Sequence, residues 1–118
     1  MKLTQTQTIL MWTLSVLLAA LFLFAGIQKL IGAPQVVEGF RQFGFPAWFR
    51  YLIGFIETVG AIGLLIPKIA AETGSFMIIV MLGALFTVLH AGGGFSTVFP
   101  ALAALFMLGG VTTLRGEQ

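Results

Sequence analysis

The sequence predicts an all-α membrane protein in which four transmembrane helices form an antiparallel bundle. The chain of 118 residues is 58% hydrophobic and only 8% charged, whereas about 25% of the residues in soluble domains are charged. Its apolar residues gather into four runs, each close to the ~20 residues that cross a hydrocarbon core. The last three runs are joined by short connections, so neighbouring helices should lie side by side and antiparallel. We expect one transmembrane domain over residues 1–118.

The four predicted spanning helices cover residues 8–31, 48–66, 70–89 and 97–114. The first run follows Lys2 and resembles a secretory signal, but it is longer than the ~7–15 apolar residues of a signal core. We interpret it as a retained helix. The third and fourth runs are joined by HAGGGFS, in which Gly92–Gly94 predict a tight turn.

The connection between the first two spanning helices has an amphipathic pattern over residues 34–43. Its apolar residues fall at helical spacing: Val36, Val37, Phe40 and Phe43. Pro34 suits a first helical turn, and Gly44 and Pro46 suit a stop. We expect a short interfacial helix, followed by Trp48 and Tyr51 as headgroup-level anchors. The alternative is a polar loop with chance apolar residues.

The polar residues at membrane depth gather towards one side of the bundle, where the first helix ends and the second begins. They are Gln28, Lys29, Arg50, Glu57, Thr87 and His90. Glu57 lies about 13 Å into the second helix by the usual rise per residue. Because helical side chains tilt towards the helix N-terminus, Glu57 should lean towards Lys29 and His90. We therefore predict that these six residues line a polar pocket that opens to one side.

Small residues accompany the polar ones on the same helix faces. Those around Glu57 are Gly54, Gly60 and Ala61. Gly83 shares a face with Thr87 and His90 by the same spacing. Small residues let helices approach closely, so we predict helix packing at Gly54, Gly60, Ala61 and Gly83. An ionisable residue at a helix centre costs about 2.5–3.5 kcal/mol on the insertion scale, so Glu57 should face inward and either pair with Lys29 or remain neutral.

Each predicted site residue also has an ordinary structural interpretation. Lys29 can snorkel to the interface, Arg50 can anchor at the headgroups, and His90 can be an interfacial histidine. Glu57 can form a purely structural buried hydrogen bond. The chain has no cysteine and one histidine, which excludes thiolate metal sites and bis-histidine haem ligation by one copy. We predict no metal site and no intrinsic cofactor.

Basic residues are split evenly between the two sides of the membrane. Those on the side of the termini are Lys2, Lys68 and Arg115, and those on the other side are Lys29, Arg41 and Arg50. This balance leaves the orientation open, and the free amino terminus favours cytoplasmic termini. The basic residues form no cluster, so no nucleic-acid partner is expected.

Several segments together carry a resemblance to a known family. The first helix ends in LFLFAGIQKL, the connection contains GFP, the second helix reads YLIGFIETVGAIGLLI, and the third ends in His90. The most specific matches are Gly26 with Lys29 and Leu30, and Glu57 with Gly54 and Gly60. Over essentially its whole length, the chain resembles the DoxX-like family of small four-helix membrane proteins.

The resemblance implies a bacterial-type inner-membrane location and association with membrane redox proteins. Members include a small subunit of a thiosulfate:quinone oxidoreductase. A related eukaryotic branch includes an assembly chaperone for nicotinic acetylcholine receptors, so the fold does not fix the function.

Three functions fit these residues, and we rank them in order. The first is an accessory subunit of a quinone-linked membrane redox system, not catalytic alone, whose pocket holds a quinone or another lipophilic ligand. The second is an assembly or interaction module without catalysis, with other membrane proteins or further copies of the chain as partners. The third is a small transporter in which Glu57 carries a proton or cation.

Overall fold

Helices make up almost all of the chain that the structure describes. The computed structural model describes residues 2–92 and 94–117, with residues 95–97 described by their backbone alone. The helices are α1 (Gln5–Ile31), α2 (Pro34–Gln42), α3 (Ala47–Leu64), α4 (Ala70–His90) and α5 (Phe95–Gly116). All but α2 are long and apolar enough to cross a membrane. With no strand among the described residues, this confirms the predicted fold class.

The helix ends follow local signals in the sequence. Helix α1 begins earlier than predicted because Thr4 and Gln7 form a reciprocal capping box. It ends at Gly32, whose φ of 73° is a left-handed conformation open to glycine. Helix α3 ends at Leu64, earlier than predicted, because Pro67 disfavours helical geometry in the residue before it.

The connection between α4 and α5 agrees with the predicted turn where the structure describes it. Gly92 has a φ of 82°. Gly94 is the N-cap of α5. Gly93, also part of the predicted turn, lies outside the described residues.

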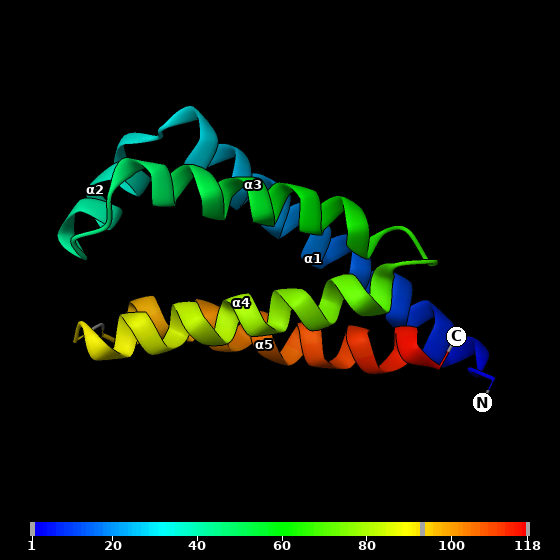
Figure 1. The fold of residues 1–118 in the computed structure, drawn as a ribbon. Coiled ribbons are helices and arrows are strands. Elements are labelled where there is room, and N and C mark those ends of the chain that lie inside the picture. The colour runs from blue at the N-terminus through cyan, green and yellow to red at the C-terminus, as the bar shows by residue number, and fades with distance from the viewer. Residues whose placement is uncertain (1, 93, 118) are drawn as a thin grey trace.

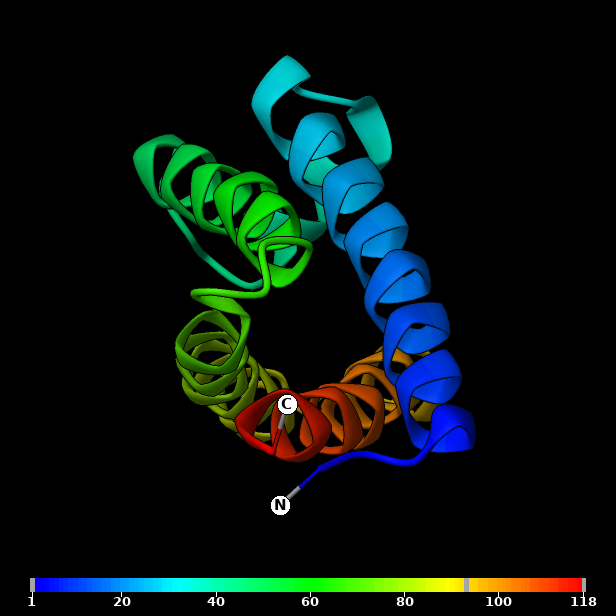
Figure 2. The same cartoon turned by 90° about the vertical axis from the view of Figure 1, so that its right-hand side faces the viewer.

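The spanning helices form two antiparallel pairs (Figure 1). Helix α1 packs mainly against α3, and α4 mainly against α5, while smaller contacts join α1 to α5 and α3 to α4. The two pairs converge at the end that carries both chain termini and diverge towards α2. Seen along the helices, they are arranged around a central axis, with both termini at the same end (Figure 2).

Glycines set the distance between α1 and α3. A Cβ added at Gly26 would lie 2.8 Å from the carbonyl oxygen of Gly54 and 2.9 Å from the backbone nitrogen of Thr58. A Cβ added at Gly54 would lie 2.9 Å from Cβ of Lys29. The two backbones are therefore too close to admit a side chain at either glycine, as in other small-residue membrane interfaces.

The other predicted packing residues differ in their surroundings. Gly60 lies against the thioether of Met77 on α4. Ala61 is buried in the core. Gly83 does not pack against a helix, because none of the described residues has an atom within 4 Å of the position of its missing Cβ. The packing predicted at Gly83 is thus absent, since α4 has already diverged from α3 at this level.

The buried core occupies the half of the bundle near the chain termini. It comprises Leu18, Ala19, Phe22, Ala61, Leu64, Met77, Leu108 and Val111. These residues come from the end of α3, the start of α4 and the end of α5, together with the middle of α1. The opposite half, beside α2, is where the helix pairs separate.

Candidate functional site

Lys29 and Glu57 form an ion pair within the spanning helices. Nζ of Lys29 lies 2.8 Å from Oε1 of Glu57, and the two side chains are 17% and 9% exposed. Lys29 belongs to the last turn of α1, and Glu57 to the middle of α3. The close packing at Gly26 and Gly54 brings these helices near enough for the side chains to meet. Of the two states expected for Glu57, the structure therefore has the paired one.

Arg50 supports this ion pair by bonding to the backbone of Lys29. Its guanidinium is buried, donates a hydrogen bond to the carbonyl oxygen of Lys29 and lies 4.4 Å from the centre of the Tyr51 ring. That carbonyl is among the last four of α1, which have no partner within the helix. Arg50 thus caps α1 at its negative end. It does not line the cavity described next, in contrast to its predicted place in the pocket.

A cavity of about 690 Å³ lies between α4 and the α1–α3 pair. Four of the predicted pocket and helix-packing residues line it: Lys29, Glu57, Thr87 and Gly83. The remaining wall is apolar: Val36, Gly39, Phe40, Phe43, Phe45, Phe49, Ile53, Ile56, Met77, Ile79, Val80, Met81, Ala84 and Val88. A mostly apolar cavity of this size with a few polar groups is typical of small-molecule sites.

Four phenylalanines form the wall of the cavity nearest to α2. They are Phe40 of α2, Phe43 and Phe45 of the following connection, and Phe49 of α3. The ring centroids of Phe45 and Phe49 are 4.8 Å apart, and those of Phe40 and Phe45 are 5.8 Å apart. The sequence predicted the apolar face of α2 but assigned it to the membrane interface. The spacing of Phe45 and Phe49 along the sequence could have indicated that the apolar face of α2 continues into α3.

His90 and Gln28 are not brought to the cavity. His90 is the last residue of α4; it is exposed, and its ring stacks on Phe86 with centroids 6.0 Å apart. Gln28 is half-buried, and its backbone carbonyl accepts a hydrogen bond from Ala33 at 3.0 Å. The predicted convergence of His90 on Glu57 is therefore absent. Its cause is the divergence of α4 from α3 towards the end of α4 (Figure 1).

Comparison with known proteins shows to which family the chain belongs. A family model described as DoxX-like matches residues 13–110. The chain belongs to the DoxX-like family. The matched residues of this DoxX-like protein include Lys29, Glu57 and every residue that lines the cavity.

This DoxX-like chain is also similar to the uncharacterized protein YdgD of Bacillus subtilis (strain 168). The two are 31% identical over 94 residues, which cover 80% of this chain and 78% of that protein. No solved structure gives a significant match.

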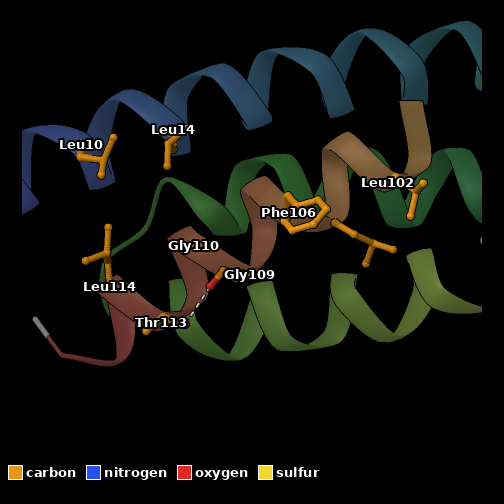
Figure 3. A pocket seen from close by; sticks show the side chains of 9 residues that line it. Leu10, Leu14, Leu102, Phe106, Gly109, Gly110, Thr113 and Leu114 are labelled. Atoms are coloured by element: carbon orange, nitrogen blue, oxygen red, sulfur yellow. Dashed lines mark hydrogen bonds between the residues drawn. The ribbon is translucent and has the colours of Figure 1, made fainter. Parts of the chain in front are cut away.

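A second hollow in the DoxX-like protein lies between α1 and α5 (Figure 3). It measures about 680 Å³, with Leu10 and Leu14 on the side of α1 and Phe106 among the residues of α5. Of the residues that line it, only Thr113 has a polar side chain, and its hydroxyl donates to the carbonyl of Gly109 at 2.8 Å. The lining thus offers no charged group to orient a ligand. The cavity beside Lys29 and Glu57 is the candidate site.

Arg115 is buried at the opposite end of this DoxX-like fold. It is only 2% exposed. It donates to Oγ of Ser15 at 3.2 Å and to the carbonyl oxygen of Leu64 at 3.1 Å, and it lies 4.2 Å from the centre of the Trp12 ring. Arg115 therefore ties the end of α5 to α1 and α3. From the sequence, Arg115 is assigned only to the basic residues on the side of the termini.

Proposed function

We propose that this protein is an accessory subunit of a membrane redox system and binds a quinone-like lipophile in the cavity beside Lys29 and Glu57. One observation carries the proposal: an ion pair stands in the wall of a cavity of about 690 Å³ that is otherwise largely apolar. Apolar walls supply affinity for a lipophile, and a few polar groups fix its orientation.

The phenylalanine wall supports a ring-bearing ligand. Phe40, Phe43, Phe45 and Phe49 gather on one side of the cavity. Aromatic rings associate in offset or edge-to-face arrangements, which contribute about 0.5–1.5 kcal/mol beyond the burial of their area. A planar headgroup between this wall and the ion pair would make both apolar and polar contacts.

The ion pair itself favours a functional role over a purely structural one. A buried ion pair is often no more stable than well-packed apolar residues of similar volume. Ionisable residues within membrane spans commonly mark a ligand or proton site. The ammonium of Lys29 suits a reduced, anionic oxygen, and the carboxylate of Glu57 suits a proton donor. The redox context itself rests on the family resemblance.

We place the protein in the inner membrane with cytoplasmic termini. At the end that carries the termini, Lys2 before α1 and Lys68 between α3 and α4 are exposed, whereas Arg115 is buried. At the other end, Lys29 and Arg50 are engaged inside the bundle, and Arg41 is paired with a carboxylate of its own helix. The exposed basic residues are thus Lys2 and Lys68 at the terminal end and Arg41 at the other, so the positive-inside rule favours the terminal end as the cytoplasmic one.

The test is the affinity of the purified protein for a short-chain hydroquinone analogue, kept reduced and measured by titration in detergent. Glu57→Gln removes the charge but keeps the shape, and we expect the affinity to fall about tenfold or more, as for loss of a charge-assisted hydrogen bond. Glu38→Gln is the matched control, because Glu38 is in an exposed ion pair with Arg41 outside the cavity lining. Equal affinity of the Glu57→Gln and wild-type proteins would contradict the proposal.

A second candidate function is the docking of a partner transmembrane helix. The observation that favours it is the hollow between α1 and α5. Among the atoms that the structure describes, none lies within 4 Å of the missing Cβ of Gly109, and only Leu14 lies near that of Gly110, at 3.9 Å. Open small residues on a membrane helix permit close approach of another helix. Docking there would be independent of Glu57, so a membrane partner that co-purifies equally with Glu57→Gln supports this candidate.

A further inference from the structure

The ion pair leaves hydrogen-bonding capacity on both partners, and that capacity lies at the cavity. The ammonium of Lys29 has three N–H donors. Its contact with Glu57 engages Oε1 at 2.8 Å. Among the described residues, Lys29 is the one partner of the Glu57 carboxylate, so Oε2 is left to accept a further hydrogen bond. A ligand at this wall meets a donor and an acceptor side by side.

The polar group on the opposite wall adds a second acceptor. Thr87 of α4 lines the same cavity, and its hydroxyl already donates to the carbonyl of Gly83 at 2.8 Å. What Thr87 can offer a ligand is therefore an oxygen lone pair. The polar lining thus combines one cationic donor, Lys29, with the acceptors of Glu57 and Thr87.

We propose that the cavity selects a lipophile whose polar end is a hydroxyl group, such as a phenol or a hydroquinone, over a carbonyl or ether of the same skeleton. The inference rests on the proposed function and specifies its ligand. A hydroxyl donates to Oε2 of Glu57 and accepts from Nζ of Lys29 at once. A carbonyl or ether oxygen only accepts, so its lone pairs would face those of the carboxylate.

For a quinone-type ligand, this selection means that the reduced form binds more tightly than the oxidised form. Reduction of a quinone by two electrons and two protons converts both of its carbonyls to hydroxyls. Tighter binding of the hydroquinone raises the reduction potential of the bound couple. A tenfold preference corresponds to about 30 mV for two electrons.

The experiment compares two redox-inert probes, a para-alkylphenol and its methyl ether, titrated against the whole protein in detergent. The ether keeps the ring and the alkyl chain but cannot donate. We expect the wild-type protein to bind the phenol about tenfold more tightly than the ether, as for loss of a hydrogen bond to a charged group. In Glu57→Gln the amide supplies donors as well as an acceptor, so the ratio of affinities should fall towards one. Comparing ratios between proteins cancels the different partition of the probes into detergent.

Two further variants keep the test interpretable. Glu38→Gln, in the exposed pair with Arg41, should retain the wild-type ratio. If Glu57→Gln fails to fold because Lys29 is left unpaired, the double variant Lys29→Gln with Glu57→Gln keeps a neutral hydrogen-bonding pair and should also lose the preference. The same phenol-to-ether ratio of affinities in the wild type and in Glu57→Gln would overturn this inference while leaving the proposed function standing. Binding of neither probe, nor of the hydroquinone analogue, would overturn both.

Discussion

At the scale of single residues, Lys29 links the backbone of the bundle to its candidate site. Its carbonyl accepts from Arg50, and its ammonium pairs with Glu57. Arg50 thereby fixes the end of α1, from which the Lys29 side chain extends. The orientation of the ion pair thus depends on a residue that does not itself line the cavity.

Arg115 provides a residue-scale prediction about stability. Arg115→Met removes the donor to Leu64 and Ser15, and two buried acceptors lose a partner. We expect the free energy of unfolding in detergent to fall by about 1–3 kcal/mol. The fluorescence of Trp12, which lies against Arg115, should change as well.

Arg41→Met is the control for this prediction. Arg41 is in an exposed pair with Glu38, so its loss should lower the free energy of unfolding by less than about 1 kcal/mol. If Arg115→Met and Arg41→Met have the same effect, then Arg115 does not tie α5 to its neighbours energetically.

At the scale of helices, what lies opposite each glycine determines how firmly two helices are held. At Gly26 the three nearest atoms all belong to α3: the hydroxyl oxygen of Thr58 and two backbone atoms, which cannot move without moving the helix. At Gly60 the neighbour is the flexible thioether of Met77. The α1–α3 contact should therefore be rigid, and the α3–α4 contact adaptable.

Alanine substitutions test this difference. Alanine favours a helix over glycine by about 1 kcal/mol at every site. At Gly26, overpacking against backbone costs about 1–3 kcal/mol, so we expect Gly26→Ala to be net destabilising. Gly60→Ala should be close to neutral, because Met77 can shift. Gly109→Ala is the control, since its added Cβ meets no described atom within 4 Å. Equal unfolding free energies for all three variants would refute the assignment of α1–α3 as the rigid contact.

Of the six predicted pocket residues, the cavity includes Lys29, Glu57 and Thr87, and the failure of the other three predictions has a physical cause. Apolar runs and small-residue spacing are local, so α1 to α5 and the meeting of Lys29 with Glu57 could be anticipated. The angle between the two helix pairs is set by packing across the whole bundle. It opens the cavity beside α2, removes His90 from Glu57 and leaves Gly83 without a helix neighbour. The inward turn of Arg115 depends equally on distant residues.

At the scale of the whole molecule, the fold is closed at one end and hollow at the other. The buried core fills the end near the termini, and the cavity occupies the end near α2. With cytoplasmic termini, the cavity would lie in the outer half of the membrane. The orientation of the protein therefore determines whether the ligand's headgroup is reached from the outer or from the cytoplasmic side of the membrane.

Cysteine labelling tests this orientation directly, because the chain has no native cysteine. Gln5→Cys and Gln42→Cys place one thiol at each end, and both positions are exposed and uncharged. In intact spheroplasts, a membrane-impermeant maleimide should label Gln42→Cys and not Gln5→Cys. In inverted vesicles the result should be reversed. Labelling of Gln5→Cys alone in spheroplasts would refute cytoplasmic termini.

The order of the helices along the chain has a consequence for how the protein is made. Both members of the ion pair, and the Arg50 that supports it, lie in α1 and α3, ahead of the short connection to α4. A single charged residue at a helix centre costs about 2.5–3.5 kcal/mol on entering the bilayer. Because Lys29 and Glu57 neutralise each other within this first hairpin, it can enter the membrane while α4 and α5 are still being synthesised. The second hairpin then brings Arg115 to its acceptors on α1 and α3 and completes the far wall of the cavity.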